Sequence, residues 1–170
     1  MIKMIAAIGK NRELGKNNDL IWHIPGDLKF FKEQTLGKTV VMGKNTFNSL
    51  PKKLPGRRHV VLADSPGFNK DISDVKVFYD YREFIRFCML EEEKEDIFII
   101  GGASIYKMFV GFADELYLTE IHDEAEADVY FPAFEKENWK MEILGEGNDN
   151  DVRYTHVRYY DRTDYAYRND

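Results

Sequence analysis

The chain has very little cysteine and no long hydrophobic run. Its 170 residues include one cysteine, Cys88, so no disulfide can form within the chain. We interpret Cys88 as a small apolar residue on a helix. No cysteine and histidine spacing is typical of a zinc site, which leaves no metal predicted. No apolar run approaches the roughly 20 residues of a membrane span, and the N-terminal apolar stretch is too short for a signal peptide. We therefore expect a cytoplasmic protein with no membrane partner.

The chain also has fewer basic than acidic residues. The chain has 24 lysines and arginines against 30 acidic residues, a formal net charge of −6. Without a long basic tract we expect no nucleic-acid partner. A small basic cluster remains at "PKKLPGRRH" (51–59), with Lys38 and Lys44 upstream. The cluster marks either the landing place of an anionic small molecule or an ordinary solvated loop.

Signals for several enzyme classes are missing. There is no G-x-S-x-G elbow, no P-loop and no Asp-x-Asp-x-Asp-Gly calcium loop. We interpret the histidines as surface or strand residues: His23, His59, His122 and His156. A bound cofactor is then the natural source of any difficult chemistry.

Short apolar runs dominate the first two thirds of the chain. Several are β-branched and several end at glycine, which is typical of buried parallel strands. They cover 4–9, 39–43, 59–63, 75–78 and 97–101. Helices are predicted between them at 25–34, 45–50, 80–92 and 103–109, and Asp80 with Glu83 forms a capping box at the start of the third. Strands that alternate with helices favour an α/β fold with a mostly parallel sheet, in one domain.

The last third has a different pattern. Strands are predicted at 115–121, 139–144 and 152–160, and 145–151, "GEGNDND", is turn material. This pattern predicts an antiparallel hairpin at the edge of the parallel sheet. We take residues 1–160 as the domain and expect the tail, 161–170, to fray.

Two strands run through glycine into a helix. "IFIIGGASIY" (97–106) has Gly101 and Gly102 at this junction, and "TVVMGKNTF" (39–47) has Gly43 followed by Lys44. Glycine lets a ligand approach the backbone, and the first N–H groups of a helix favour phosphate. The two junctions could hold the two ends of a dinucleotide. Because the full dinucleotide fingerprint is absent, each could also be a tight turn without a ligand.

One carboxylate stands among apolar residues. "IWHIPGDLKFFK" (21–32) places Asp27 in the first turn of a helix begun by Pro25, on one face with Phe30 and Phe31. Asp27 either stabilises the helix N-terminus or pairs with a flat, amidine-like heterocycle held against the rings.

Together these stretches resemble the dihydrofolate reductases of bacteria. The resemblance runs from "MIAAIGKNRELGKNNDLIWHIPGDLKFFK" through "TVVMGKNTFNSLPKKLPGRRHVVL" and "IFIIGGASIY" to "LYLTEI" and "ADVYFP". It implies an eight-stranded, mainly parallel sheet with an antiparallel C-terminal strand, flanked by helices. It also implies hydride transfer from NADPH to 7,8-dihydrofolate, in support of one-carbon metabolism and thymidylate synthesis.

The resemblance implies a role for each residue that matches a family motif. Asp27 would bind the pterin ring, Thr119 would hydrogen-bond Asp27 and a pterin-linked water, and water would be the direct proton donor. Arg57 would bind the glutamate α-carboxylate. The implied catalytic residues are Asp27, Leu20, Trp22, Thr119 and Tyr106. The implied substrate-binding residues are Ile5, Ala7, Asp27, Leu28, Phe31, Lys32, Leu50, Leu54, Arg57, Ile100 and Thr119. Diaminopyrimidine or pteridine antifolates would bind the same pocket, and we expect a monomer.

The implied NADPH site takes in both glycine junctions and a mobile loop at 14–24, which Asp128 would hold closed through backbone N–H groups. Its residues are Ala7, Leu14, Gly15, Leu20, Gly43, Lys44, Asn45, Thr46, Leu62, Ala63, Asp64, Ile100, Gly101, Gly102, Ala103, Ser104, Ile105 and Tyr106. The adenosine end departs from the family pattern, since Lys44 stands where arginine is frequent and Asp64 would repel a 2′-phosphate. We predict a preference for NADPH that is weaker than usual.

Two other functions stay open at this point. A reductase of the same fold from pterin or deaminoriboflavin metabolism would keep the glycine junctions but need not keep Asp27 and Arg57. A dinucleotide-binding protein without catalytic activity would keep the glycine junctions alone.

Overall fold

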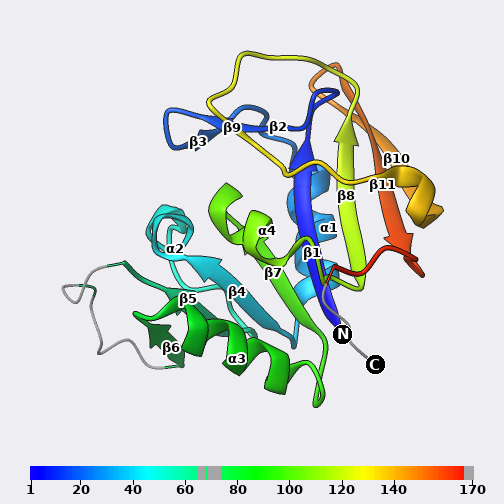
Figure 1. The fold of residues 1–170 in the computed structure, drawn as a ribbon. Helices are drawn as coiled ribbons and strands as arrows, with labels where there is room; N and C mark the ends of the chain where they lie inside the picture. The colour runs from blue at the N-terminus through cyan, green and yellow to red at the C-terminus, as the bar shows by residue number, and fades with distance from the viewer. Residues whose placement is uncertain (65–67, 69–73, 167–170) are drawn as a thin grey trace.

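The fold is built on one eight-stranded sheet (Figure 1). It is seen in a computed structural model that describes residues 1–64, 68 and 74–166. The strand order is β10-β11-β8-β1-β7-β4-β5-β6. These strands are β1 (Ile2–Ile8), β4 (Thr39–Gly43), β5 (Arg58–Leu62), β6 (Val75–Phe78), β7 (Ile97–Gly101), β8 (Glu115–Ile121), β10 (Lys140–Asp149) and β11 (Val152–Tyr160). Strand β11 runs antiparallel to both of its neighbours, and the pairs from β8 to β6 are parallel. The predicted α/β fold is confirmed.

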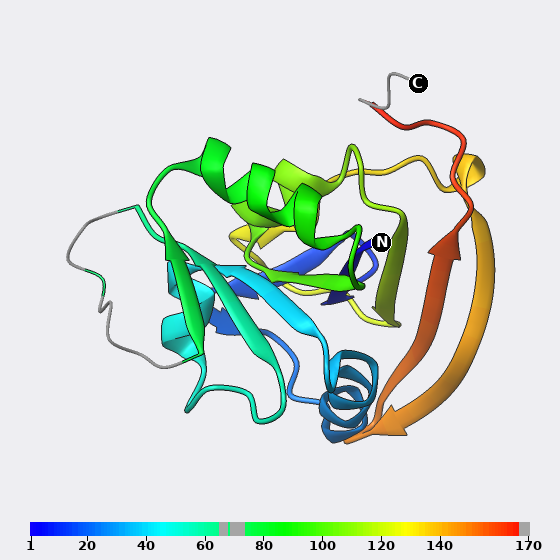
Figure 2. The same ribbon diagram turned by 90° about the horizontal axis from the view of Figure 1, so that it is seen from below.

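Helices cover both faces of this sheet. They are α1 (Pro25–Thr35), α2 (Lys44–Ser49), α3 (Tyr81–Glu91) and α4 (Ala103–Phe109). Figure 2 shows α1 and α2 on one face and α3 and α4 on the other. Asp80 caps α3 by accepting hydrogen bonds from the N–H groups of Arg82 and Glu83, as the predicted capping position requires.

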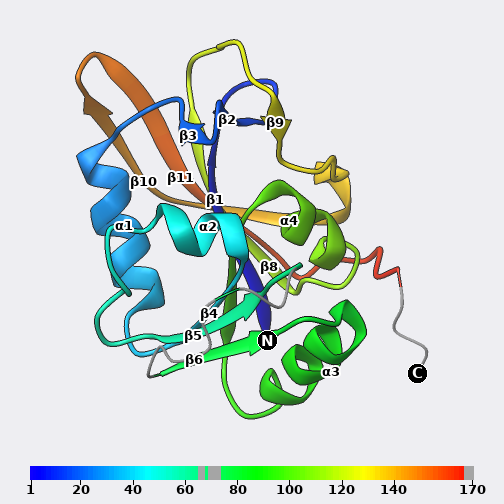
Figure 3. The ribbon, with the colours of Figure 1, turned by 90° about the vertical axis from the view of Figure 1, so that its left-hand side faces the viewer.

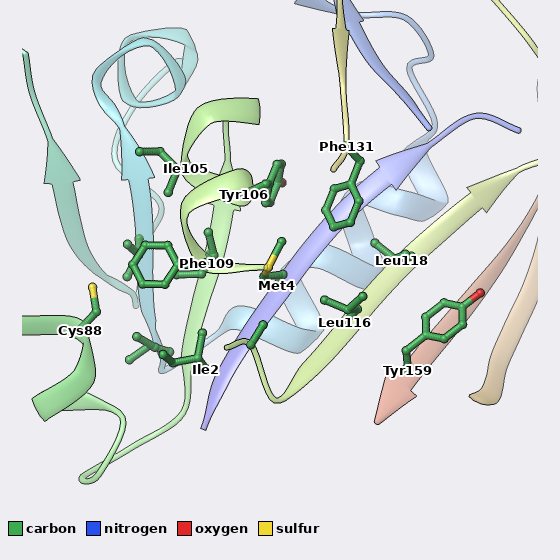
Figure 4. Packing of buried hydrophobic residues seen from close by; sticks show 14 of the residues in the cluster. Ile2, Met4, Cys88, Ile105, Tyr106, Phe109, Leu116, Leu118, Phe131 and Tyr159 are labelled. Atoms are coloured by element: carbon green, nitrogen blue, oxygen red, sulfur yellow. The ribbon is translucent and has the colours of Figure 1, made fainter. Parts of the chain in front are cut away.

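The core has a separate apolar cluster on each face. On the α3 and α4 face, Phe84, Cys88 and Phe109 pack against Met4 and Leu116 of the sheet (Figure 4). On the other face, residues of α1 and α2 pack against strands β1, β4 and β7 in a cluster that includes Phe30, Phe47, Ile5, Met42 and Phe98. Successive side chains of each strand point to opposite faces of the sheet and so contribute to both clusters, which explains the continuous apolar runs in the sequence.

A small second sheet was not predicted from the sequence. It consists of β3 (Asp19–Leu20), β2 (Glu13–Lys16) and β9 (Val129–Tyr130), in that order. Strands of two and four residues carry too little periodicity to stand out, and β2 pairs with β9 more than 100 residues away in the chain.

The prediction of a turn over 145–151 is wrong. Strand β10 continues to Asp149, and the turn is only Asn150 and Asp151, with φ of 54° and 62°. Two residues with positive φ form the tight hairpin turn that suits the twist of the flanking strands. Gly147 lies inside strand β10, where a β-carbon would be 2.3 Å from the ring carbon Cζ of Tyr154, so glycine is needed there to leave room for the ring.

The expected fraying does not describe residues 161–166. Arg162 is buried, and its Nη1 donates to the carbonyl oxygens of Val110 at 2.7 Å and Ala113 at 3.0 Å. The hydroxyl of Tyr165 donates to Asp114 at 2.9 Å. Residues 167–170 of the tail lie outside the described residues. A short 3-10 helix, η1 (Lys136–Asn138), also binds this segment, because Thr163 N–H donates to the Asn138 carbonyl.

Candidate active site

Asp27 lies where the first turn of α1 faces strand β8. Its carboxylate accepts a hydrogen bond from the hydroxyl of Thr119, a residue with only 1% of its surface exposed. Pro25 starts the helix, as predicted. Burial raises the pKa of Asp27 above its ordinary value, while the bond from Thr119 and the nearby His156 act in the opposite direction. The site therefore holds a carboxylate that is ready to accept a further charged or polar partner.

Apolar side chains of β1, α1, β7 and the loop after α2 form a cluster on the face of the sheet that α1 covers. Five of the predicted substrate-binding residues join the cluster on the α1 and α2 face: Ile5, Phe31, Leu50, Leu54 and Ile100. Phe31 comes from α1 and Leu50 follows α2, so the segments of both helices contribute side chains to this one apolar cluster on the sheet. Leu28 and Lys32 also lie on α1, but both are exposed, Leu28 at 64%.

Arg57 is held in a fixed position beside the C-terminal end of α1. Its Nε donates to the Pro55 carbonyl at 3.0 Å and its Nη1 donates to Thr35 Oγ1 at 3.1 Å. Burial lowers the pKa of this guanidinium group. Leu54 is fixed nearby, since its N–H donates to Nε2 of His59 at 3.0 Å. A guanidinium ordered in this way can bind a carboxylate with its remaining N–H groups.

The two glycine junctions meet at one end of the sheet. Strands β4 and β7 are neighbours, and α2 and α4 follow them directly (Figure 3). A β-carbon on Gly101 would lie 3.3 Å from Thr46 Oγ1, and one on Gly102 would lie 3.5 Å from it. Gly101 has φ of 133°, a backbone conformation that residues other than glycine rarely adopt. The Gly101–Gly102 peptide is cis. The structure thus brings both predicted junctions into contact.

These junctions and their neighbours account for most of the predicted cofactor residues. Asn45 and Thr46 lie in α2, and Ala103, Ser104 and Ile105 open α4. Tyr106 is buried, and its hydroxyl donates to the Ile5 carbonyl at 2.6 Å, which ties α4 to β1. Burial strongly raises the pKa of the Tyr106 phenol, so it is a neutral hydrogen-bond donor.

An ion pair stands at the adenosine end of the predicted cofactor site. Lys44 Nζ lies 2.6 Å from Asp64 Oδ1, and the lysine lowers the pKa of that carboxyl. Asp64 follows Leu62 and the buried Ala63 at the end of β5. Asp64 would thus compete with a phosphate for Lys44.

The segment predicted to close over the cofactor is held by Asp128. The N–H of Asn17 donates to Asp128 Oδ2 at 2.9 Å, and Asp128 N–H donates to the carbonyl of Gly15 at 3.0 Å. Leu14 and Gly15 lie on β2 and Leu20 on β3. Beyond β3, Trp22 and Ala7 both pack against the cluster of Ile24, Ile121 and Tyr154, and Trp22 Nε1 donates to Asp123 at 3.0 Å. The predicted contact of Asp128 with a backbone N–H is therefore present.

Known proteins identify the family to which this arrangement belongs. The family model for dihydrofolate reductase matches residues 1–162. The chain belongs to the dihydrofolate reductase family. It is accordingly an oxidoreductase that reduces dihydrofolate with NADPH.

Individual dihydrofolate reductases match along nearly the whole chain. The enzyme of Bacillus subtilis is 38% identical over 151 residues, which cover 89% of this chain and 87% of that protein. The type 3 dihydrofolate reductase of Salmonella typhimurium is 39% identical over 140 residues, 82% of this chain and 83% of that protein. A solved dihydrofolate reductase from Enterococcus faecalis, complexed with NADP(H) and RAB-propyl, has 31% identity and a TM-score of 0.78, with coverage of 94% and 95%.

Two residues of this site were missed in the sequence. His156 was interpreted as a surface or strand histidine, yet it is buried on β11 with its Nδ1 2.9 Å from Thr119 Oγ1. Asp149 was assigned to a turn, yet its carboxylate accepts from the N–H of Gly26 at 2.7 Å and from the hydroxyl of Tyr154 at 3.1 Å. Alternation along 152–160 places Tyr154 and His156 on one face, but only the strand register brings that face to α1.

Proposed function

We propose that Asp27 is the ionisable side chain of this chain that binds the pterin ring of dihydrofolate, and that the ring packs against the apolar cluster shared by α1 and the segment after α2. The observation that carries this proposal is the hydrogen bond from buried Thr119 to the Asp27 carboxylate, at the edge of an apolar cluster. A carboxylate pairs well with the 2-amino group and ring N–H of a pterin, because two parallel hydrogen bonds match its two oxygens.

In this proposal Arg57 binds the α-carboxylate of the substrate's glutamate. Support comes from its two internal hydrogen bonds, which orient the guanidinium so that little further side-chain entropy is lost on binding. Ile5, Phe31, Leu50, Leu54 and Ile100 supply the apolar contacts between the two charged ends. Diaminopyrimidine and pteridine antifolates would pair with Asp27 in the same way.

NADPH supplies the hydride when it is bound. The glycine junction fits such a group, since Gly101 and Gly102 leave the space that β-carbons would fill next to Thr46. Gly43, Asn45, Thr46 and the first residues of α4 would hold its phosphates, and Tyr106 would line the nicotinamide end. Asp128 would hold the segment with Leu14, Gly15, Leu20 and Trp22 over the site and keep bulk water out.

Asp27 contributes charge and orientation in this mechanism. It binds the pyrimidine side of the pterin, and we assign the proton that enters at N5 to water. The raised pKa of Asp27 reflects the cost of burying a carboxylate at this position, and binding of a pterin would offset that cost. Tyr106, with its hydroxyl committed to Ile5, positions the strand backbone.

The experiment is the loss of NADPH absorbance on addition of 7,8-dihydrofolate to the purified protein. We expect turnover that depends on both compounds and is blocked by a diaminopyrimidine. NADPH oxidation that does not respond to dihydrofolate would contradict the proposal. A same-fold reductase with another substrate would show this second result, and it would not require Asp27 and Arg57 together. We further expect a monomer that acts in the cytoplasm; the helices of the described residues include none long and apolar enough to cross a membrane.

A further inference from the structure

His156 lies next to Thr119, the residue that bonds Asp27, and the proposed function gives His156 no role. It sits on β11 opposite Thr119 of β8 in the antiparallel register. Its ring stacks on Phe30 of α1, with ring centroids 3.9 Å apart and planes 11° from parallel. Only 9% of the residue is exposed. The imidazole is therefore fixed in place between the sheet and the helix that carries Asp27.

The hydrogen bonds around Thr119 determine which atom of His156 carries a proton. Nδ1 of His156 is 2.9 Å from Thr119 Oγ1, and the same hydroxyl is bonded to Asp27 Oδ1. A threonine hydroxyl has one hydrogen to donate. An ionised Asp27 can only accept, so Thr119 must donate to it, and His156 must then donate from Nδ1. The three groups form one chain of hydrogen bonds that ends on the carboxylate.

The other charged groups facing His156 are acidic. Asp27 and Glu33 face it from α1 and Asp149 faces it from β10, and each favours the protonated ring. Burial has the larger effect and lowers the pKa of the imidazole. Tyr154, on the same strand, contacts the ring edge with centroids 5.2 Å apart. At neutral pH the ring is then neutral and acts through its Nδ1–H.

We propose that His156 is a positioning residue for the reaction: its Nδ1–H orients the Thr119 hydroxyl toward Asp27 and favours the ionised carboxylate. The effect of His156 on the reaction rests on the proposed function, since an ionised Asp27 is the form that would bind the pterin.

Protonation of Asp27 reverses this chain of hydrogen bonds. A protonated Asp27 donates to Thr119 Oγ1, Thr119 donates to Nδ1 of His156, and the ring proton must then be on Nε2. The site has gained one proton in total, on Asp27, while the ring has exchanged its Nδ1 proton for one on Nε2. The tautomer of His156 is thus coupled to the charge of Asp27.

The test is an NMR titration of the Asp27 side-chain carboxyl carbon in the full-length enzyme without substrate, assigned with Asp27→Asn. His156→Phe keeps an aromatic ring against Phe30 but has no donor. His156→Asn keeps an N–H donor near the position of Nδ1. His122→Phe is the matched control, because His122, directly after β8, bonds Thr155 of β11 at 2.9 Å, and Thr155, adjacent to His156, points to the opposite face.

We expect His156→Phe to raise the Asp27 pKa by about 0.5–1 pH unit, the shift that corresponds to one net hydrogen bond. His156→Asn and the control should stay near the wild-type value. The acid limb of the kcat/KM profile should move with the titration in His156→Phe. In the wild type, the ring nitrogen shifts should show the Nδ1–H tautomer while Asp27 is ionised.

An unchanged Asp27 titration in His156→Phe would overturn the proposal. The same shift in His156→Asn as in His156→Phe would also overturn it, because ring packing rather than the donor would then be responsible. So would an Nε2–H tautomer beside an ionised Asp27. The titration needs no turnover, so a failure of dihydrofolate reduction would leave it intact and would count only against the proposed function.

Discussion

At the scale of single residues, the carboxylate proposed to bind the substrate is partly buried, which costs free energy in the unliganded protein. Asp27 is a carboxylate whose pKa is raised by burial despite the hydrogen bond from Thr119. Such a group destabilises the free protein, and a ligand that paired with Asp27, as proposed, would recover the loss on binding. Function and stability therefore pull in opposite directions at this position.

Asp27→Asn should stabilise the free protein at neutral pH. A folded-state pKa above the unfolded-state value means that the folded protein binds more protons between the two values, so stability falls as pH rises through that window. The amide removes this term, and we expect Tm at pH 7 to rise by about 2–4 °C, the effect of roughly 1 kcal/mol in a chain of this size. Thermal unfolding at pH 7 and pH 4 checks it, with a smaller difference at pH 4. A lower Tm at pH 7 would contradict this reading of the Asp27 environment.

Asp64→Ser should strengthen the preference for NADPH over NADH. Asp64 lies 2.6 Å from Lys44, so its removal frees the lysine for the 2′-phosphate and removes a like charge. We expect the ratio of kcat/KM for NADPH to that for NADH to exceed one in the wild type and to rise about two- to fivefold, as the pair is exposed. Asp161→Ser is the control, because Asp161 pairs with Lys140 at the same 2.6 Å on another part of the surface. A ratio of one or less in the wild type would refute the NADPH preference.

At the scale of helices and strands, patterns that repeat within one segment were predictable and pairings between segments were not. The parallel strands, the four helices and the cap at Asp80 follow from local apolar runs and turn residues. The β2, β3 and β9 sheet, the length of β10 and the burial of His156 depend on register with distant strands. Gly147 illustrates the difference, since glycine suggests a turn locally, whereas here it makes room for Tyr154.

Helix α3 shields the only cysteine, so labelling of Cys88 reports on that helix. Cys88 is 1% exposed, and burial raises the pKa of its thiol to about 12. We expect a thiol reagent at pH 8 to modify the folded protein on the order of a thousandfold more slowly than a free cysteine, because opening the core costs several kcal/mol. The reaction should be complete in denaturant. Rapid labelling of the folded protein would mean that α3 opens without global unfolding.

At the scale of the whole molecule, the parallel sheet brings the two binding functions together. Strand β1 lies between β7 and β8, so the α4 junction and the Thr119 position flank it on either side. Helices α1 and α4 cover opposite faces of the sheet (Figure 2), and in open α/β sheets ligands bind at the carboxyl ends of the central strands. The family motifs allowed most of these residues to be predicted, including the bond between Thr119 and Asp27. Their distances, and the competing Lys44–Asp64 pair, required the structure.

The most direct test of the account compares wild type and Asp27→Asn in dihydrofolate-dependent NADPH oxidation at pH 7, alongside the affinity of each for NADPH. The account predicts that turnover falls by several powers of ten in the variant, while NADPH affinity changes by no more than about twofold, since Asp27 lies outside the glycine junctions. Turnover close to that of the wild type in Asp27→Asn would contradict the assignment of Asp27 as the group that binds the pterin.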